Sequence, residues 1–200
     1  MTNTQKAIKL VREFKDNGIF FGDVGSIAFK DGENIWITKS GGRKYDEDGF
    51  TLVDPSGKPL MDESEKLSGE YPIHSSVLYN TEHDVVIHTH SPLHAAFGNV
   101  FPNYCFDAPA LEMRKLLGLR KVDDEYTLQT IENSFDKKEL ADTVTEHLVD
   151  DLAVLVANHG LFVAGPNLDK ANDYVRGLNH MIHQVIYEAQ MRGNNLFGDW

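Results

Sequence analysis

Two histidines, one residue apart, follow a run of β-branched residues in the segment VVIHTHSP at positions 85–92. On a strand, residues two apart point to the same face of the sheet, so His88 and His90 would aim their imidazoles in one direction. Two imidazoles placed in this way can bind one metal ion. Two polar residues at the point where a strand leaves the core would give the same pattern, so the motif alone leaves both interpretations open.

A third histidine lies at the end of another apolar segment. His159 stands in VANHGLFV, directly before a glycine. Histidines at strand ends, next to turns, lie where sheets build functional sites. Three imidazoles would leave coordination positions open for a substrate, as catalytic zinc requires. A turn histidine bonded to the backbone is the alternative.

Glu70 is the fourth candidate, because it lies where a helix is expected to begin within LSGEYPIH. A carboxylate in the first turn is favourable to the helix dipole, which is reason enough for its presence. Beside a metal ion the same group could act as a general acid and base. His74 falls one turn later on the same helix face and is expected to pack beside the site without binding the ion.

The segments that would hold these residues show helical or strand periodicity. Helices are predicted at 4–17, 70–80, 92–97, 136–150 and 172–192, and strands at 26–30, 34–39 and 84–90, with a strand–turn–strand element at 50–61. The apolar segment 152–165 predicts either two strands joined by a tight turn or one strand with a bulge. Residues 100–133 show no clear pattern. Helices and strands mixed along 200 residues favour one α/β layered domain, residues 1–200.

The composition is that of a soluble globular protein. The chain is 41% hydrophobic and 25% charged, and its formal net charge is −12. This negative charge disfavours binding to nucleic acid or to an anionic membrane surface. No stretch has the roughly 18 apolar residues of a membrane span. Cys105 is the single cysteine, so no intrachain disulfide can form, and a cytoplasmic location is expected.

Three segments together resemble the class II aldolase/adducin family, which includes L-fuculose-phosphate aldolase and L-ribulose-5-phosphate 4-epimerase. They are LSGEYPIHSSVLYNTEHDVVIHTHSPLHAAF (67–97), ANHGLFVAG (157–165) and NLDKANDYV (167–175). Their order and spacing follow the family over most of the chain. The resemblance implies a central, mostly antiparallel, nine-stranded sheet flanked by helices, and a homotetramer.

The resemblance also implies one divalent metal ion per chain, bound by His88, His90 and His159. Zinc is the favoured ion, with Mn²⁺, Co²⁺ and Fe²⁺ as alternatives. The family's catalytic acid and base maps onto Glu70, and a glutamate here, in place of the aspartate of the epimerase, favours an aldolase. A second proton donor, often lent by a neighbouring subunit, would map near Tyr104 or Asp107.

Three loops form the family's phosphate pocket, and they map onto Gly25-Ser26, Ser40-Gly41 and Ser68-Gly69. Ser26 stands where the family has asparagine and Gly69 where it has a second serine, so a sugar acid is an alternative to a sugar phosphate. The start of a helix after Gly69 favours an anion. Basic residues crowd the second loop, where they would either attract the anion or be solvated loop charge: Lys39, Arg43 and Lys44.

These expectations describe a metal-dependent lyase of carbohydrate metabolism. It would cleave a C–C bond of a small hydroxylated carbonyl substrate through an enediolate that the metal stabilises. A decarboxylase or a sugar-phosphate 4-epimerase of the same family would use the same site. An adducin-like interaction domain without catalysis is the alternative of another class, although such a module has no need of three histidines and Glu70.

Overall fold

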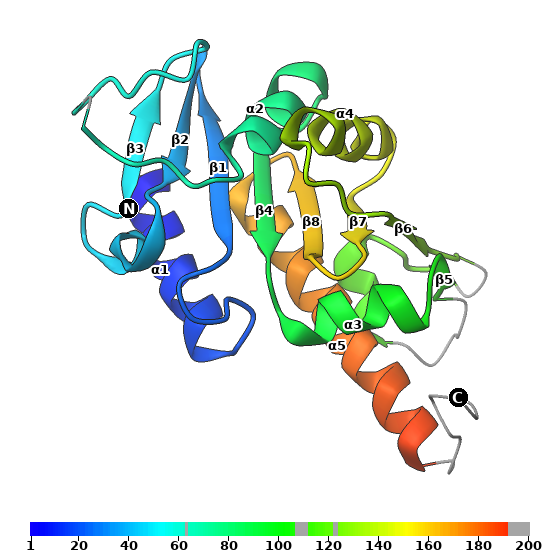
Figure 1. Ribbon diagram of the computed structural model, residues 1–200. Helices are drawn as coiled ribbons and strands as arrows, with labels where there is room; N and C mark the ends of the chain where they lie inside the picture. The colour runs from blue at the N-terminus through cyan, green and yellow to red at the C-terminus, as the bar shows by residue number, and fades with distance from the viewer. Residues whose placement is uncertain (63, 107–111, 122–123, 192–200) are drawn as a thin grey trace.

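The computed structural model describes residues 1–62, 64–106, 112–121 and 124–191. Its described strands form one eight-stranded sheet in the order β3-β2-β1-β4-β8-β7-β6-β5 (Figure 1). Neighbouring strands run antiparallel, except that β6 and β7 are parallel. The predicted α/β architecture with a mostly antiparallel sheet flanked by helices is therefore confirmed.

Among the described residues the sheet has eight strands, so the expected number of nine is not confirmed. They are β1 (Ser26–Asp31), β2 (Asn34–Thr38), β3 (Phe50–Val53), β4 (Val85–Thr89), β5 (Tyr104–Cys105), β6 (Thr127–Ile131), β7 (Ala153–Val156) and β8 (Gly160–Gly165). After β3 the chain turns back and meets it through an isolated bridge between Val53 and Pro59 and a hydrogen bond from the amide of Leu60 to the carbonyl of Leu52 at 2.8 Å. Because proline has no N–H to donate, this returning segment does not extend into the strand that was predicted within 50–61.

Helices cover both faces of the sheet. They are α1 (Asn3–Asp16), α2 (Tyr71–Asn80), α3 (Pro92–Val100), α4 (Lys137–Leu148) and α5 (Leu168–Met191), with the 3-10 turns η1 (Gly41–Tyr45) and η2 (Glu112–Leu117). One buried cluster joins α1, α3 and α5 to one face, and a second joins α2 and α4 to the other. Among these described helices, none is both long and apolar enough to cross a membrane.

Strand β4 lies at the centre of the sheet and carries the predicted histidine pair. It pairs with β1, where Ser26 lies opposite His88, and with β8, where Phe162 lies opposite His88. Val86 packs in the same cluster as α2 and α4, and side chains alternate along a strand, so His88 points to this face. The starts of α2 and α4 lie on this face as well, beside each other (Figure 1).

Candidate metal centre

His88 is held by contacts on three sides at the end of β4. Its side chain is fully buried, and its ring stacks on Phe162 with 3.8 Å between ring centroids and 9° between planes. Nδ1 lies 3.2 Å from the carbonyl oxygen of Leu161, which can only accept a hydrogen bond. A proton on Nδ1 leaves a lone pair on Nε2, and this atom faces Nε2 of His90 at 2.9 Å. Two imidazole nitrogens facing each other at this distance are suited to share a cation.

His159 reaches the same place from the tight turn between β7 and β8. Asn158 has the left-handed φ of 57° in this turn, and the amide of His159 donates to the carbonyl of Val156 at 3.0 Å. The turn presses so closely on β4 that a Cβ on Gly160 would lie 1.8 Å from the carbonyl oxygen of Thr89. Of the two alternatives for this segment, the two-strand prediction is therefore confirmed.

Glu70 completes a group of four possible ligands. It caps α2, and its carbonyl accepts from the amides of Ile73 and His74. Its Oε1 lies 3.9 Å from Nε2 of His159. One ligand atom from each of Glu70, His88, His90 and His159 lies within 4.8 Å of every other, so the structure brings these predicted residues together.

The chemistry of this group fits a divalent metal ion. Burial lowers the pKa of His88 well below 6.5 and that of His90 to about 4, and it also lowers the pKa of His159. The imidazoles are therefore neutral at physiological pH, which is the form that binds metal. Oε2 of Glu70 and Nδ1 of His159 are buried without a hydrogen-bond partner among the described residues. Three imidazoles and one carboxylate are the ligand types that zinc prefers.

His74 supports the site from the side, as its place in the helix predicted. It is fully buried, and its Nε2 lies 2.7 Å from Oγ of Ser26. Burial lowers the pKa of His74 to about 4. The Ser26 hydroxyl is buried in this contact and holds His74, and its predicted role in binding an anion stays a prediction.

The second and third predicted anion loops run together before α2, and Ser26 of the first loop contacts His74 within α2. An isolated bridge pairs Lys39 with Leu67, the amide of Ser40 donates to Lys66, and the amide of Ser68 donates to Thr38, so the second and third loops run together. The Ser68 hydroxyl accepts from the amide of Glu70 at 3.3 Å. Gly25 and Gly41 have left-handed φ values of 92° and 68°. Gly69 has open space where a Cβ would be.

The basic residues of the second loop, predicted either to attract an anion or to be solvated loop charge, have partners within the protein. Nζ of Lys39 lies 2.8 Å from Asp48 and 2.9 Å from Glu65, and Arg43 lies 3.2 Å from Glu65. Lys44 is buried, and its Nζ donates to the carbonyl of Gly25 at 2.5 Å. These cations are already paired within the protein, so an anion at the loops would rely on backbone amides.

Tyr104, one of the two predicted second proton donors, does not lie at the metal centre of its own chain. Tyr104 lies on the edge strand β5, separated from β4 by β8, β7 and β6. Its ring packs against those of Phe97, Phe101 and Phe106, with centroids 5.0 to 5.6 Å apart. Asp107 lies outside the described residues.

Comparison with known proteins decides the family. A family model described as the Class II Aldolase and Adducin N-terminal domain matches residues 5–186. The chain belongs to the class II aldolase/adducin family. Family members of known structure share its fold: the L-fuculose-1-phosphate aldolase of Thermus thermophilus superposes with a TM-score of 0.76 at 21% identity, covering 95% of this chain and 97% of that one.

Two curated class II relatives carry the name methylthioribulose-1-phosphate dehydratase. The protein of a Sulfurihydrogenibium species is 29% identical over 188 residues, covering 88% of this chain and 87% of its own. The protein of Bos taurus is 31% identical over 198 residues, covering 91% of this chain and 81% of its own. Dehydratases and aldolases are both lyases, so the predicted class of enzyme is supported at this level.

Lys137 contacts Glu70 at the candidate metal centre, and the sequence did not reveal this contact. Lys137 is the first residue of α4, and its Nζ lies 2.7 Å from Oε1 of Glu70. Its neighbour Lys138 is the same residue type, but it faces solvent and pairs with Asp142. A lysine at the start of an amphipathic helix carries no signal in the sequence, since only the packing of α4 against α2 brings it to Glu70.

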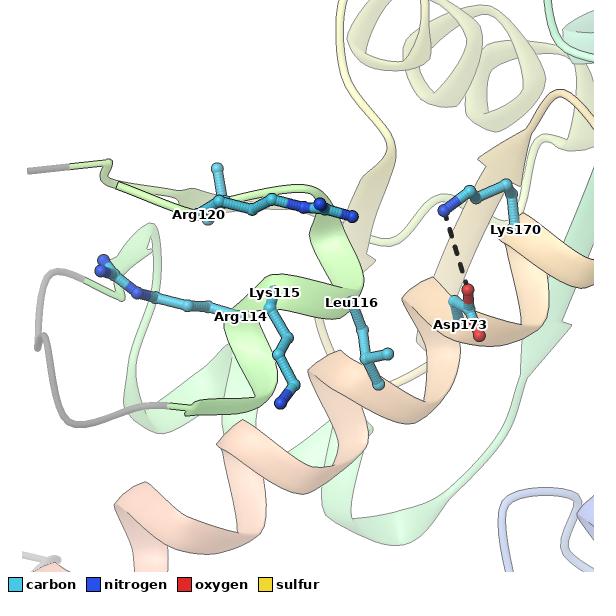
Figure 2. Close-up of a pocket in the computed structure, with 7 residues that line it drawn as sticks. Arg114, Lys115, Leu116, Arg120, Lys170 and Asp173 are labelled. Atoms are coloured by element: carbon cyan, nitrogen blue, oxygen red, sulfur yellow. Dashed lines mark ion pairs between the residues drawn. The ribbon is translucent and has the colours of Figure 1, made fainter. Parts of the chain in front are cut away.

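A separate basic pocket lies between η2 and α5 (Figure 2). Its volume is about 550 Å³. Helix α5 packs on the opposite face of the sheet from α2 and α4. Arg114 is turned away to donate to the carbonyls of Asp124 and Lys121, and Lys170 lies 3.9 Å from Asp173. No predicted site residue lines this pocket, and Arg114 within it holds the chain after η2 in place.

Proposed function

We propose that this protein is a metal-dependent lyase that acts on a small phosphorylated sugar carrying a carbonyl group. The observation that carries the proposal is the convergence of three neutral imidazoles and one carboxylate within 4.8 Å. A binding module without catalysis, such as the adducin-like alternative, needs no such group. The two curated relatives named as dehydratases of a sugar phosphate support a lyase of this kind.

Elimination of water is the reaction that we favour over cleavage of a C–C bond. The relatives named as dehydratases are 29% and 31% identical to the chain, whereas the solved aldolase is 21% identical and supports the fold alone. The predicted aldol cleavage remains the alternative within this proposal. Both reactions form an enolate next to a carbonyl group, and both need a proton carrier beside it.

A divalent cation bound by His88, His90 and His159 would supply Lewis-acid polarisation of the substrate carbonyl. Glu70 would then take a proton from the carbon next to that carbonyl. Oε2 is the atom that we assign to this transfer, because it has no partner among the described residues while Oε1 is bonded to Lys137. The same oxygen would return the proton to the departing hydroxyl group, which leaves as water.

The anionic end of the substrate would lie at the start of α2. Amides at a helix N-terminus favour an anion through their free N–H groups and the helix dipole. Gly69 leaves open space there, and the left-handed turn at Gly41 lies on the neighbouring loop. Such a position would hold a phosphate close to Glu70 without help from the basic residues of the second loop.

The test is an assay of the purified protein with ketose phosphates and hydroxy-keto acids, with products followed by mass. One product lighter by one water indicates a dehydratase, two carbonyl fragments an aldolase, release of carbon dioxide a decarboxylase, and an isomer of equal mass an epimerase. Only the first outcome supports our preference. No turnover of any of these substrates by protein loaded with Zn²⁺, Mn²⁺, Co²⁺ or Fe²⁺ would contradict the lyase.

Glu70→Gln separates proton transfer from metal binding. The variant should keep close to one metal ion per chain, while turnover falls by roughly 100-fold to 10,000-fold, the usual contribution of a general acid or base. Glu146→Gln, an exposed carboxylate on α4, is the matched control and should keep wild-type turnover. Unchanged turnover in Glu70→Gln would remove Glu70 from the mechanism.

A further inference from the structure

The contact between Lys137 and Glu70 bridges the starts of two helices beside the metal centre. Nζ of Lys137 lies 2.7 Å from Oε1 of Glu70, and the side chains are 44% and 14% exposed. Ion pairs with one partner so accessible contribute little to stability, because solvent screens them. The pair therefore contributes little to the stability of the fold. Its place next to three histidines indicates a role in the site.

The backbone of Lys137 is fixed relative to Glu70 by capping and by packing. The Asp136 carboxylate caps α4 by accepting from the amide of Lys138 at 2.8 Å. Farther along, Oγ1 of Thr145 bonds to Oγ of Ser76 at 2.8 Å and ties α4 to α2. The ammonium group therefore reaches Glu70 from a fixed starting point on a rigid element.

The carboxylate of Glu70 can either remain beside the histidines or join them as a ligand. Its reach is sufficient, because a carboxylate oxygen lies within 4.8 Å of each histidine ligand atom. A carboxylate bound to the metal would lose basicity and would occupy a position that a substrate needs. The ammonium of Lys137 attracts Oε1 toward α4 and so opposes this movement.

We propose, building on the lyase function above, that Lys137 is a positioning residue that keeps Glu70 beside the metal and off it. The bond to Oε1 leaves Oε2 directed for proton transfer and leaves the fourth metal position to the substrate. Lys137 acts through Glu70 and does not itself transfer a proton. Direct binding of the substrate anion by Lys137 is the competing role.

The experiment compares Lys137→Met and Lys137→Arg with wild type, and Lys138→Met serves as the matched control. Lys138 is adjacent, equally charged and 85% exposed, and it pairs with Asp142 instead of Glu70. The first readout is the affinity of the metal-free protein for Co²⁺, followed by its visible absorption. In Lys137→Met, the released carboxylate should become a ligand and raise Co²⁺ affinity by about 10-fold, which is the usual size but the opposite sign of the effect of changing a residue that supports metal ligands.

The second readout is the separation of kcat from KM. Lys137→Met should lower kcat by about 10-fold to 100-fold with little change in KM. Lys137→Arg should restore most of the activity and the wild-type Co²⁺ affinity, because a guanidinium can also bond to Oε1. In the Glu70→Gln background, Lys137→Met should have no further effect on either readout, since a residue that acts through Glu70 is not additive with it.

The two proposals fail in different ways. If Lys137→Met raises KM alone and leaves Co²⁺ affinity unchanged, Lys137 binds the substrate and the positioning role is wrong. If it matches wild type in every readout while wild type is active, the positioning role is wrong and the lyase stands. If no variant shows lyase activity but Lys137→Met still changes Co²⁺ affinity and absorption, the positioning of Glu70 stands and the lyase is wrong.

Discussion

The buried ammonium of Lys44 gives the protein an unusual dependence of stability on pH. Its side chain is 3% exposed, and its Nζ donates to the carbonyls of Asp23 and Gly25 at 2.7 and 2.5 Å. Burial lowers the pKa of Lys44 from 10.5 to about 8, and the Asp23 carboxylate offsets part of this effect. The folded protein therefore releases this proton more readily than the unfolded chain does.

The sign of the effect follows from proton linkage. Above about pH 8 the unfolded chain still binds the proton that the folded protein has lost, so the free energy of unfolding rises with pH up to about 10.5. For these two pKa values the rise from about pH 7.5 to about pH 9.5 is about 2 kcal/mol. Lys44→Met has no titrating group at this position and should lack this rise.

The measurement is urea unfolding of wild type and Lys44→Met at these two pH values, followed by tryptophan fluorescence. The difference in free energy of unfolding between wild type and Lys44→Met should increase by about 2 kcal/mol from the lower to the higher pH. Lys138→Met, which removes an 85% exposed lysine, is the control, and its difference from wild type should stay constant. A constant difference for Lys44→Met as well would refute the reasoning, because Lys44 would then keep its proton in the folded protein.

Two further substitutions test the packing around β4. His94 is buried and bonds to Asn179, and burial lowers its pKa to about 4. Below about pH 6.5 the unfolded chain therefore binds a proton at His94 that the folded protein does not, and the folded protein loses stability. From about pH 7.5 to about pH 5.5, metal-free wild type should lose about 1 kcal/mol more stability than His94→Gln in urea unfolding, and equal losses would contradict this. Gly160→Ala would place Cβ 1.8 Å from the carbonyl oxygen of Thr89 and should lower the free energy of unfolding by about 3 kcal/mol or more. Gly69→Ala, with no atom within 4 Å, is its control, and similar thermal midpoints for the two variants would be inconsistent with the tight β4–β8 contact.

The strands and helices that hold the metal centre were largely predictable from the sequence. The apolar run before His88 predicted a strand at 84–90, and β4 is observed at Val85–Thr89. For the apolar segment around His159, one of the two predicted alternatives was a pair of strands joined by a tight turn, and β7 and β8 are observed there. Strong periodicity and short connections carry this information locally, so little long-range packing is needed to predict it.

The parts that escaped prediction depend on partners far along the chain. Strand β6 has the sequence TLQTI, in which polar and apolar residues mix, and it is a strand because it pairs in parallel with β7. Lys39 looked like free loop charge, but packing brings Glu65 to 2.9 Å from its Nζ. Lys137 reaches Glu70 only through the packing of α4 on α2. None of these contacts can be predicted from a local sequence pattern.

The pairing of β4 with β8 joins segments that are distant in sequence, and this has a consequence for folding kinetics. His88 and His90 come from one strand of the pair, and His159 comes from the turn that leads into the other. The ligand set therefore exists only after a long-range step, which is the slow kind in folding. A metal ion that requires all three imidazoles would bind after this step and would slow unfolding. A chelator should therefore increase the rate of unfolding in proportion to the metal removed.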